Sequence, residues 1–182
     1  SFLLNTMEDC DGASCDSKLV DKNLISLDAT LWNLRGFRCN EWLVSSPDNI
    51  LDFFLKRVPT AGHNIAFNSK LKNILLPFPD LIECHDTWIG LIIATISRWS
   101  FIDDTLTKFR QHSDNVSGID RQSKLKEAIA SIKNNTFTWH VSLYNELIKR
   151  LSQSDYNIKP EVMGLLASRR DHSEVRSKMN CN

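Results

Sequence analysis

The apolar run from Trp88 to Ile96 and the two segments after it constrain the fold more than any other part of the chain. The run has the length of a helix and follows Asp86, whose side-chain oxygen can cap the free N–H groups of a first helical turn. The segments WSFID and TKFRQH have the composition of strands. We therefore expect a helix–strand–strand unit of an α/β fold, in which the strands return His112 toward the end of the helix that carries Asp86.

The length and charge of the chain exclude several classes of protein. A chain of 182 residues can build one sizeable core plus an appendage. Its 22 basic and 22 acidic residues cancel, and no basic stripe is interleaved with aromatic residues, which argues against binding to nucleic acid. The longest apolar run is far below the ~20 residues needed to span a bilayer, and no charged start precedes an apolar signal region. These features predict a soluble, cytoplasmic protein.

The cysteines predict neither a disulfide scaffold nor a structural zinc site. There are five of them, an odd number, with no C-x-x-C pair and no regular spacing. We expect reduced thiols. A thiol–imidazole pair of Cys84 and His85 is disfavoured, because adjacent residues of an extended segment point to opposite faces.

Turn and capping signals predict further elements before residue 82. A strand at 13–20 ends in the turn VDKN, and 30–37 forms a short helix or an irregular segment. Ser46-Pro47-Asp48 is a strong helix start, and the helix is broken by Pro59 to Gly62.

Beyond this break, 64–67 reads as a short strand and Asn68 as the cap of another short helix. From Asp120 onward, apolar residues recur at helical spacing, so this part is predicted to form amphipathic helices. The polar stretch from His172 to Asn182 is predicted to fray.

Four motifs follow one another in an order that is found in a known enzyme family. They are the strand and turn Cys15–Asn23, the loop residues Pro59, Ala61, Gly62, His63 and Asn64, the pair His85-Asp86 with Trp88, and the group Arg110, Gln111, His112, Asn115, Val116 and Gly118. Over roughly the first two-thirds of the chain, this order resembles the C-terminal half of the family 2 glycosyltransferases with the GT-A fold, particularly the bacterial rhamnosyltransferase-like members. The resemblance implies that 1–118 form the acceptor-binding, catalytic-base half of a Rossmann-like GT-A domain, followed by a helical appendage at 119–182.

The chain departs from this family at its beginning. Family members carry, upstream of these motifs, a nucleotide-binding half with an Asp-x-Asp metal motif. Asp9-Cys10-Asp11 has the letters of that motif but falls just before the strand at 13–20, so we interpret it as a solvated turn. We expect a fragment, a split gene product or a truncated paralogue that is inactive without the nucleotide-binding half.

The resemblance implies a catalytic role for Asp86, as the general base that takes a proton from the acceptor hydroxyl. The alternative role for Asp86 is a plain helix cap. His112 corresponds to a metal-binding histidine, which implies a divalent cation, manganese or magnesium, in the complete enzyme; the alternative is an ordinary core or surface histidine.

The resemblance also implies substrate contacts for Gly62, His63, His85, Trp88 and Arg110. Each of three has a structural alternative: Gly62 ends the preceding helix, Trp88 belongs to the core, and Arg110 forms a surface salt bridge.

The implied reaction is inverting transfer of a sugar from a nucleotide-diphosphate sugar to a hydroxyl of a glycan or lipid-linked acceptor, in cell-surface polysaccharide biosynthesis. The implied partners are these substrates and a separate chain with the nucleotide-binding half. An uncovered strand edge would also favour homo-oligomers. The location would be cytoplasmic or peripheral at the inner membrane face. The alternative function is a non-catalytic module that binds a glycan or a protein.

Overall fold

The computed structural model describes residues 10–39, 47–56, 58–82, 84–112 and 136–179. The chain is a mixed α/β protein with a four-stranded mixed sheet. It divides into two compact units: Ser1–Phe78 with Cys84–Gly118, and Pro79–Glu83 with Ile119–Asn182. The first unit contains the sheet, and the described residues of the second include two helices.

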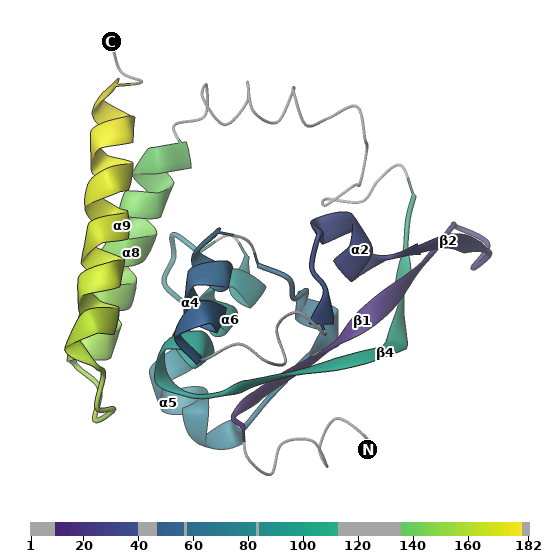
Figure 1. Cartoon of the computed structure of the whole chain (residues 1–182), viewed down its shortest axis with the longest axis horizontal. Helices are drawn as coiled ribbons and strands as arrows, with labels where there is room; N and C mark the ends of the chain where they lie inside the picture. The colour runs from purple at the N-terminus through teal and green to yellow at the C-terminus, as the bar shows by residue number, and fades with distance from the viewer. Residues whose placement is uncertain (1–9, 40–46, 57, 83, 113–135, 180–182) are drawn as a thin grey trace. The chain divides into compact units, whose positions relative to one another are not determined.

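Strand β1 (Gly12–Val20) is the centre of the sheet, as Figure 1 shows. It pairs in parallel with β4 (Trp99–Arg110), and antiparallel with β3 (Ile65–Phe67) and β2 (Ser26–Thr30). Because β1 pairs with strands along both edges, its residues are buried, with Lys18 as the one exposed residue of the strand. The strand predicted at 13–20 is confirmed.

The prediction of two strands after the apolar helix is wrong, because WSFID and the first four residues of TKFRQH belong to the single strand β4. The residues between the two segments form a bulge in β4 instead of a turn. Ile102 lies opposite Cys15, but the next residue of β1, Asp16, lies opposite Thr105. A bulge adds residues to one strand and disrupts the ladder locally without ending it.

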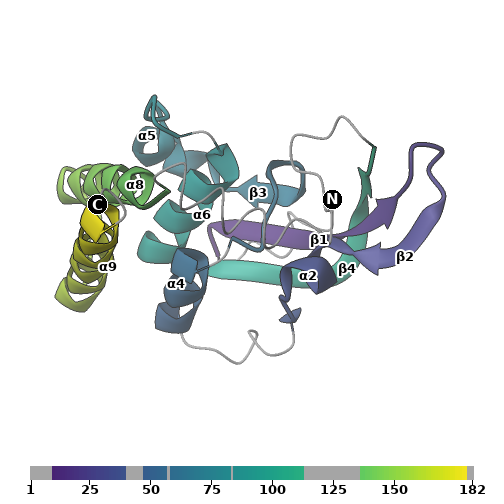
Figure 2. The same cartoon turned by 90° about the horizontal axis from the view of Figure 1, so that it is seen from above.

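Two helices pack side by side where β1 and β4 begin, as Figure 2 shows. They are α4 (Pro47–Lys56) and α6 (His85–Ile96). Gly90 of α6 permits their close approach, since a Cβ atom there would lie 2.4 Å from Cε1 of Phe54. The Phe54 ring in turn contacts Trp99 of β4, with ring centroids 5.2 Å apart. These contacts make Phe54 of α4 part of the core, where it is 2% exposed.

Short elements at the other end of β1 follow local capping signals. Helix α2 (Leu31–Arg35) begins at Thr30, whose side chain accepts a hydrogen bond from the N–H of Asn33, and ends at Gly36 in a left-handed conformation, φ 68°. Of the two predictions for this segment, the short helix is confirmed. This conformation explains why residue 36 is a glycine, since residues with a Cβ atom rarely adopt positive φ.

The loop after α4 leads through two 3₁₀ turns into a short helix. These are η1 (Gly62–Asn64), η2 (Ser69–Leu71) and α5 (Lys72–Leu75). Asn68 caps η2 by accepting a hydrogen bond from the N–H of Lys70, which confirms the predicted cap. Strand β3 lies between the two turns and confirms the short strand predicted at 64–67.

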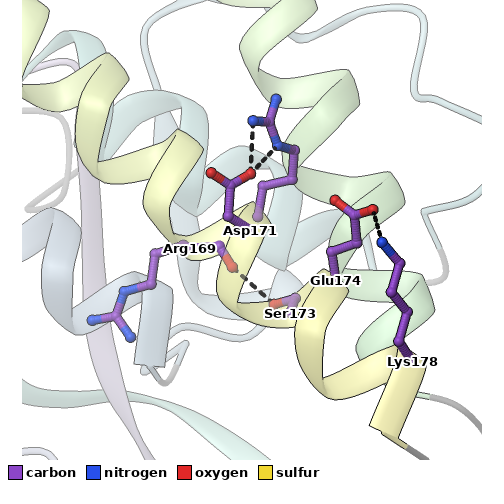
Figure 3. A network of polar contacts seen from close by, with 6 residues as sticks. Arg169, Asp171, Ser173, Glu174 and Lys178 are labelled. Atoms are coloured by element: carbon purple, nitrogen blue, oxygen red, sulfur yellow. Dashed lines mark hydrogen bonds and ion pairs between the residues drawn. The ribbon is translucent and has the colours of Figure 1, made fainter.

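The second unit contains α8 (Thr136–Ser152) and α9 (Pro160–Met179). Helix α8 buries Leu143, Tyr144, Leu147 and Leu151, and α9 buries Leu166. The predicted fraying from His172 is wrong as far as Met179, because α9 continues there. Figure 3 shows two reasons: the Ser173 hydroxyl donates to the carbonyl of Arg169, and Lys178 pairs with Glu174 one turn earlier. Helices predicted between residues 120 and 135 lie outside the described residues.

Within the described ranges, the helices are too short or too polar to cross a membrane.

Candidate functional site

Two side chains hold the loop from Val58 to Asn64 in place. Arg35, in the last turn of α2, donates from Nη1 to the carbonyl of Val58 at 3.0 Å and also to the carbonyl of Thr60. Asn64 is 2% exposed; its Oδ1 accepts from the N–H of Ala61 at 2.8 Å, and its Nδ2 donates to the carbonyl of Cys15 at 2.8 Å. The loop is therefore fixed to both α2 and β1.

Gly62 lies in this loop, directly against His85 at the start of α6. A Cβ atom on residue 62 would lie 2.1 Å from His85 Nε2, so the contact requires glycine. The alternative role for Gly62, ending the preceding helix, is wrong, because α4 ends at Lys56. The close contact joins the two motifs that the family resemblance places at the acceptor side.

Asp86 is not the cap of α6. The N-cap residue is Cys84, which has an extended backbone and whose carbonyl accepts hydrogen bonds from Thr87 and Trp88 N–H groups, at 3.1 and 3.5 Å. Asp86 lies in the first turn, half-buried, and its Oδ1 accepts from the N–H of Thr87 at 2.8 Å. The predicted capping role is therefore wrong by two positions. A carboxylate in a first turn is still favoured by the helix dipole.

Asp86 is close enough to Arg35 and His63 to act on the pKa of each. Burial lowers the pKa of Arg35, while Asp86 and then Cys84 oppose that change. Burial also lowers the pKa of His63, the positive charge of Arg35 lowers it further, and Asp86 opposes both. The three side chains come from α2, η1 and α6, so the fold assembles them from segments that are distant in sequence.

His63 is attached to the sheet by one ring nitrogen and one ring face. Its Nε2 lies 2.9 Å from Ser17 Oγ of β1, and its ring stacks on Phe109 of β4 with centroids 5.1 Å apart and planes 8° from parallel. Ser17 Oγ also lies 2.7 Å from Thr107 Oγ1. The His63 side chain remains exposed, whereas Ser17 is fully buried.

A serine–histidine pair of this kind can form a nucleophile, but the burial of Ser17 argues against it here. A nucleophilic hydroxyl must reach the substrate, and Ser17 is 0% exposed. Cys84 is exposed at the start of α6, and the described cysteines Cys10, Cys15, Cys39 and Cys84 are free thiols.

Trp88 does not contribute a surface to the site. Its side chain is 0% exposed, and its Nε1 donates to the carbonyl of Leu75 at 3.0 Å. The interpretation of Trp88 as a substrate contact is therefore wrong, and its alternative, a core aromatic residue, is correct. The physical reason is that residues near the middle of α6 face the core.

Arg110 and His112 lie at and just beyond the end of β4, and both are exposed. His112 follows Thr107 by five residues, which span about 17 Å in an extended chain. Their assigned roles stay predictions. Asn115, Val116 and Gly118 of the same motif lie outside the described residues.

In the part of the chain that the structure describes, no three histidine, cysteine, aspartate or glutamate side chains are grouped as a metal site would require. The described residues therefore do not complete a divalent-cation site around His112. Asp11 is not a solvated turn residue: it pairs with Lys70 Nζ at 2.8 Å and accepts from Ser97 Oγ at 2.7 Å. Asp9 lies outside the described residues.

The sequence analysis missed Arg35, Ser17 and Thr107. No local signal marks them, because each acquires its role from partners far away along the chain. Of the seven residues that the resemblance assigned to the site, Gly62 contacts His85, and His63 and Asp86 lie near Arg35. We name Gly62, His63, His85, Asp86 and Arg35 the His63–Asp86 cluster.

Comparisons of the chain with protein-family models, with curated proteins and with solved structures find no match.

Proposed function

We propose that the chain is the acceptor-binding, base-carrying half of an inverting family 2 glycosyltransferase with the GT-A fold. It acts with a nucleotide-binding half to transfer a sugar from a nucleotide-diphosphate sugar to a glycan hydroxyl. The observation that carries this proposal is the His63–Asp86 cluster, in which the glycine loop and the first turn of α6 meet. A half-buried carboxylate beside polar, partly exposed side chains is what a base acting on a sugar hydroxyl requires.

In this reaction Asp86 accepts the proton of the acceptor hydroxyl. The acceptor oxygen forms a bond to the anomeric carbon while the bond from that carbon to the diphosphate oxygen breaks, so the nucleoside diphosphate leaves with the electron pair. Attack from the face opposite the leaving group inverts the configuration. Asp86 lies in the first turn of α6, at the positive end of the helix dipole.

Arg35 and His85 shape the surroundings of this base. Arg35 fixes the loop that carries Gly62 and His63, and it brings a positive charge near Asp86. His85 packs against Gly62. It is exposed and directly precedes Asp86 in the chain. A divalent cation would neutralise the departing diphosphate in the complete enzyme. The described residues do not form its site, so we assign no step to it.

The proposal is tested by measuring sugar transfer with a nucleotide-binding half joined to the chain or added separately. Asp86→Asn retains the volume and polarity of the side chain but cannot take up the proton. We expect turnover to fall by about 100- to 10,000-fold, the usual contribution of a general base, with donor binding unchanged. The matched control is Asp104→Asn, an exposed aspartate on β4. Near-normal turnover of Asp86→Asn would exclude Asp86 as the base.

A further inference from the structure

The hydroxyl of Ser17 has more contacts than it has hydrogens. Its Oγ lies 2.9 Å from His63 Nε2, 2.7 Å from Thr107 Oγ1 and 3.4 Å from Asn64 Nδ2. A serine hydroxyl can donate once and accept twice. The buried Ser17 therefore gives its one hydrogen to a single neighbour and accepts from the other two.

Asn64 must be one of the donors. Its Oδ1 accepts from the N–H of Ala61, which leaves Nδ2 facing Cys15 and Ser17. The amide nitrogen can only donate. Ser17 consequently donates either to His63 or to Thr107, and accepts from the other.

The surroundings of Thr107 decide between these two arrangements. Its hydroxyl lies 3.5 Å from the carbonyl of Asp16, at a point where the register between β1 and β4 shifts on both sides of Asp16. A strand carbonyl at a bulge loses its regular partner and needs another donor. The single hydrogen of the Thr107 hydroxyl meets this need.

The Thr107 hydrogen therefore points away from Ser17, and Ser17 donates to Thr107. It follows that Ser17 accepts from His63, whose Nε2 carries the ring hydrogen. Within the described ranges His63 makes this hydrogen bond and the stacking contact with Phe109, and neither contact uses Nδ1 of this exposed residue.

We propose that Ser17 and Thr107 are positioning residues that hold neutral His63 with its hydrogen on Nε2, so that Nδ1 accepts a hydrogen bond from a hydroxyl of the acceptor sugar. The location of that sugar rests on the proposed function of Asp86. The charged groups that act on His63 are Arg35 of α2 and Asp86 of α6. Burial and Arg35 lower the pKa of His63, against the opposing effect of Asp86, so the ring is neutral at neutral pH and retains a lone pair.

The position of the ring hydrogen can be measured on the chain itself by long-range ¹H–¹⁵N NMR of the histidine side chains. In the wild type we expect the hydrogen on Nε2 of His63. Thr107→Val keeps the shape of the side chain but removes the acceptor of the Ser17 hydrogen. Ser17 must then donate to His63 Nε2, and the ring hydrogen should move to Nδ1.

Two further variants distinguish this effect from a general disturbance of the sheet. Thr107→Ser restores the hydroxyl and should restore the wild-type tautomer. Ser14→Ala removes another buried hydroxyl of β1, which accepts from Trp99 Nε1 at 3.1 Å, and should leave His63 unchanged. A wild-type ring with its hydrogen on Nδ1, or a Thr107→Val protein with the wild-type tautomer, would overturn the proposal.

The ligand is tested separately by titrating the chain with methyl α-glucoside, methyl α-mannoside and methyl α-galactoside. At least one should shift the Nδ1 resonance of His63 in the wild type and in Thr107→Ser, and the shift should be lost in Thr107→Val. Absence of an Nδ1 shift with all three glycosides contradicts the role in sugar binding. These measurements involve no sugar transfer, so a failed tautomer prediction and a failed Asp86 assay are independent results.

Discussion

The imidazole of His85 lies on the backbone of Gly62, at a position where a methyl group on residue 62 would be 2.1 Å from Nε2. The same kind of close approach occurs at Gly90, where a methyl group would be 2.4 Å from the ring of Phe54. The two contacts differ in whether the side chain that meets the glycine can move away. His85 is exposed and its side chain can rotate into solvent, whereas Phe54 is 2% exposed and enclosed by the core.

We predict that Gly62→Ala and Gly90→Ala differ in their effects, the first acting on the site and the second on stability. Gly62→Ala should displace His85 at little cost in stability and so lower sugar transfer. Gly90→Ala should reduce the free energy of unfolding by about 1–3 kcal/mol, because a packed core cannot accept an added group without strain. Chemical denaturation of both variants, with NMR of the His85 ring, checks this. A Gly62→Ala protein with an unmoved His85 ring would contradict the contact.

The sequence predicts those parts of the fold that depend on local signals. Asn68 caps η2 through its own side chain, and the strand β1 is recognisable from its length and the turn after it. The single strand β4 could not be predicted in this way. Polar residues at its centre, including Asp103 and Asp104, are typical of a turn, and only pairing with β1 makes them a bulge.

The same distinction holds for the candidate site. Asp86 and Gly62 were assigned to a site by resemblance to a family, and their roles stay predictions. Ser17 and Thr107 are 90 residues apart, and neither segment predicts their hydrogen bond. Trp88 was assigned wrongly because nearness to Asp86 in the sequence says nothing about the direction in which a helical side chain points.

We predict that the chain self-associates through β4. Among the described strands, β4 pairs only with β1, so its second edge offers backbone groups to another strand. Leu106 of this strand is 45% exposed. Leu106→Lys should shift the species measured by light scattering toward monomer, because a charged side chain blocks pairing of edges. The control is Leu76→Lys, which alters a residue of similar exposure, 46%, outside the sheet. Equal association of wild type and Leu106→Lys would exclude this edge.

The last prediction concerns the pH dependence of stability. The pKa of His63 in the folded chain lies below its ordinary value of 6.5, first because of burial and then because of Arg35. Between the folded and the ordinary pKa, the unfolded chain binds more protons than the folded chain, so stability falls as the pH falls through that interval. The contribution is fully present above the ordinary pKa.

His63→Gln should therefore be less sensitive to acid than the wild type. We expect the difference in free energy of unfolding between the two proteins to be constant above pH 7 and to shrink as the pH falls below 6.5. The change should be small, because the His63 side chain is exposed and solvent weakens its interactions. Urea denaturation at closely spaced pH values gives this difference directly, and His172→Gln, at an exposed position of α9, serves as the control. A difference that grows toward low pH would mean that folding raises the pKa of His63, and that Asp86 outweighs burial and Arg35 in its surroundings.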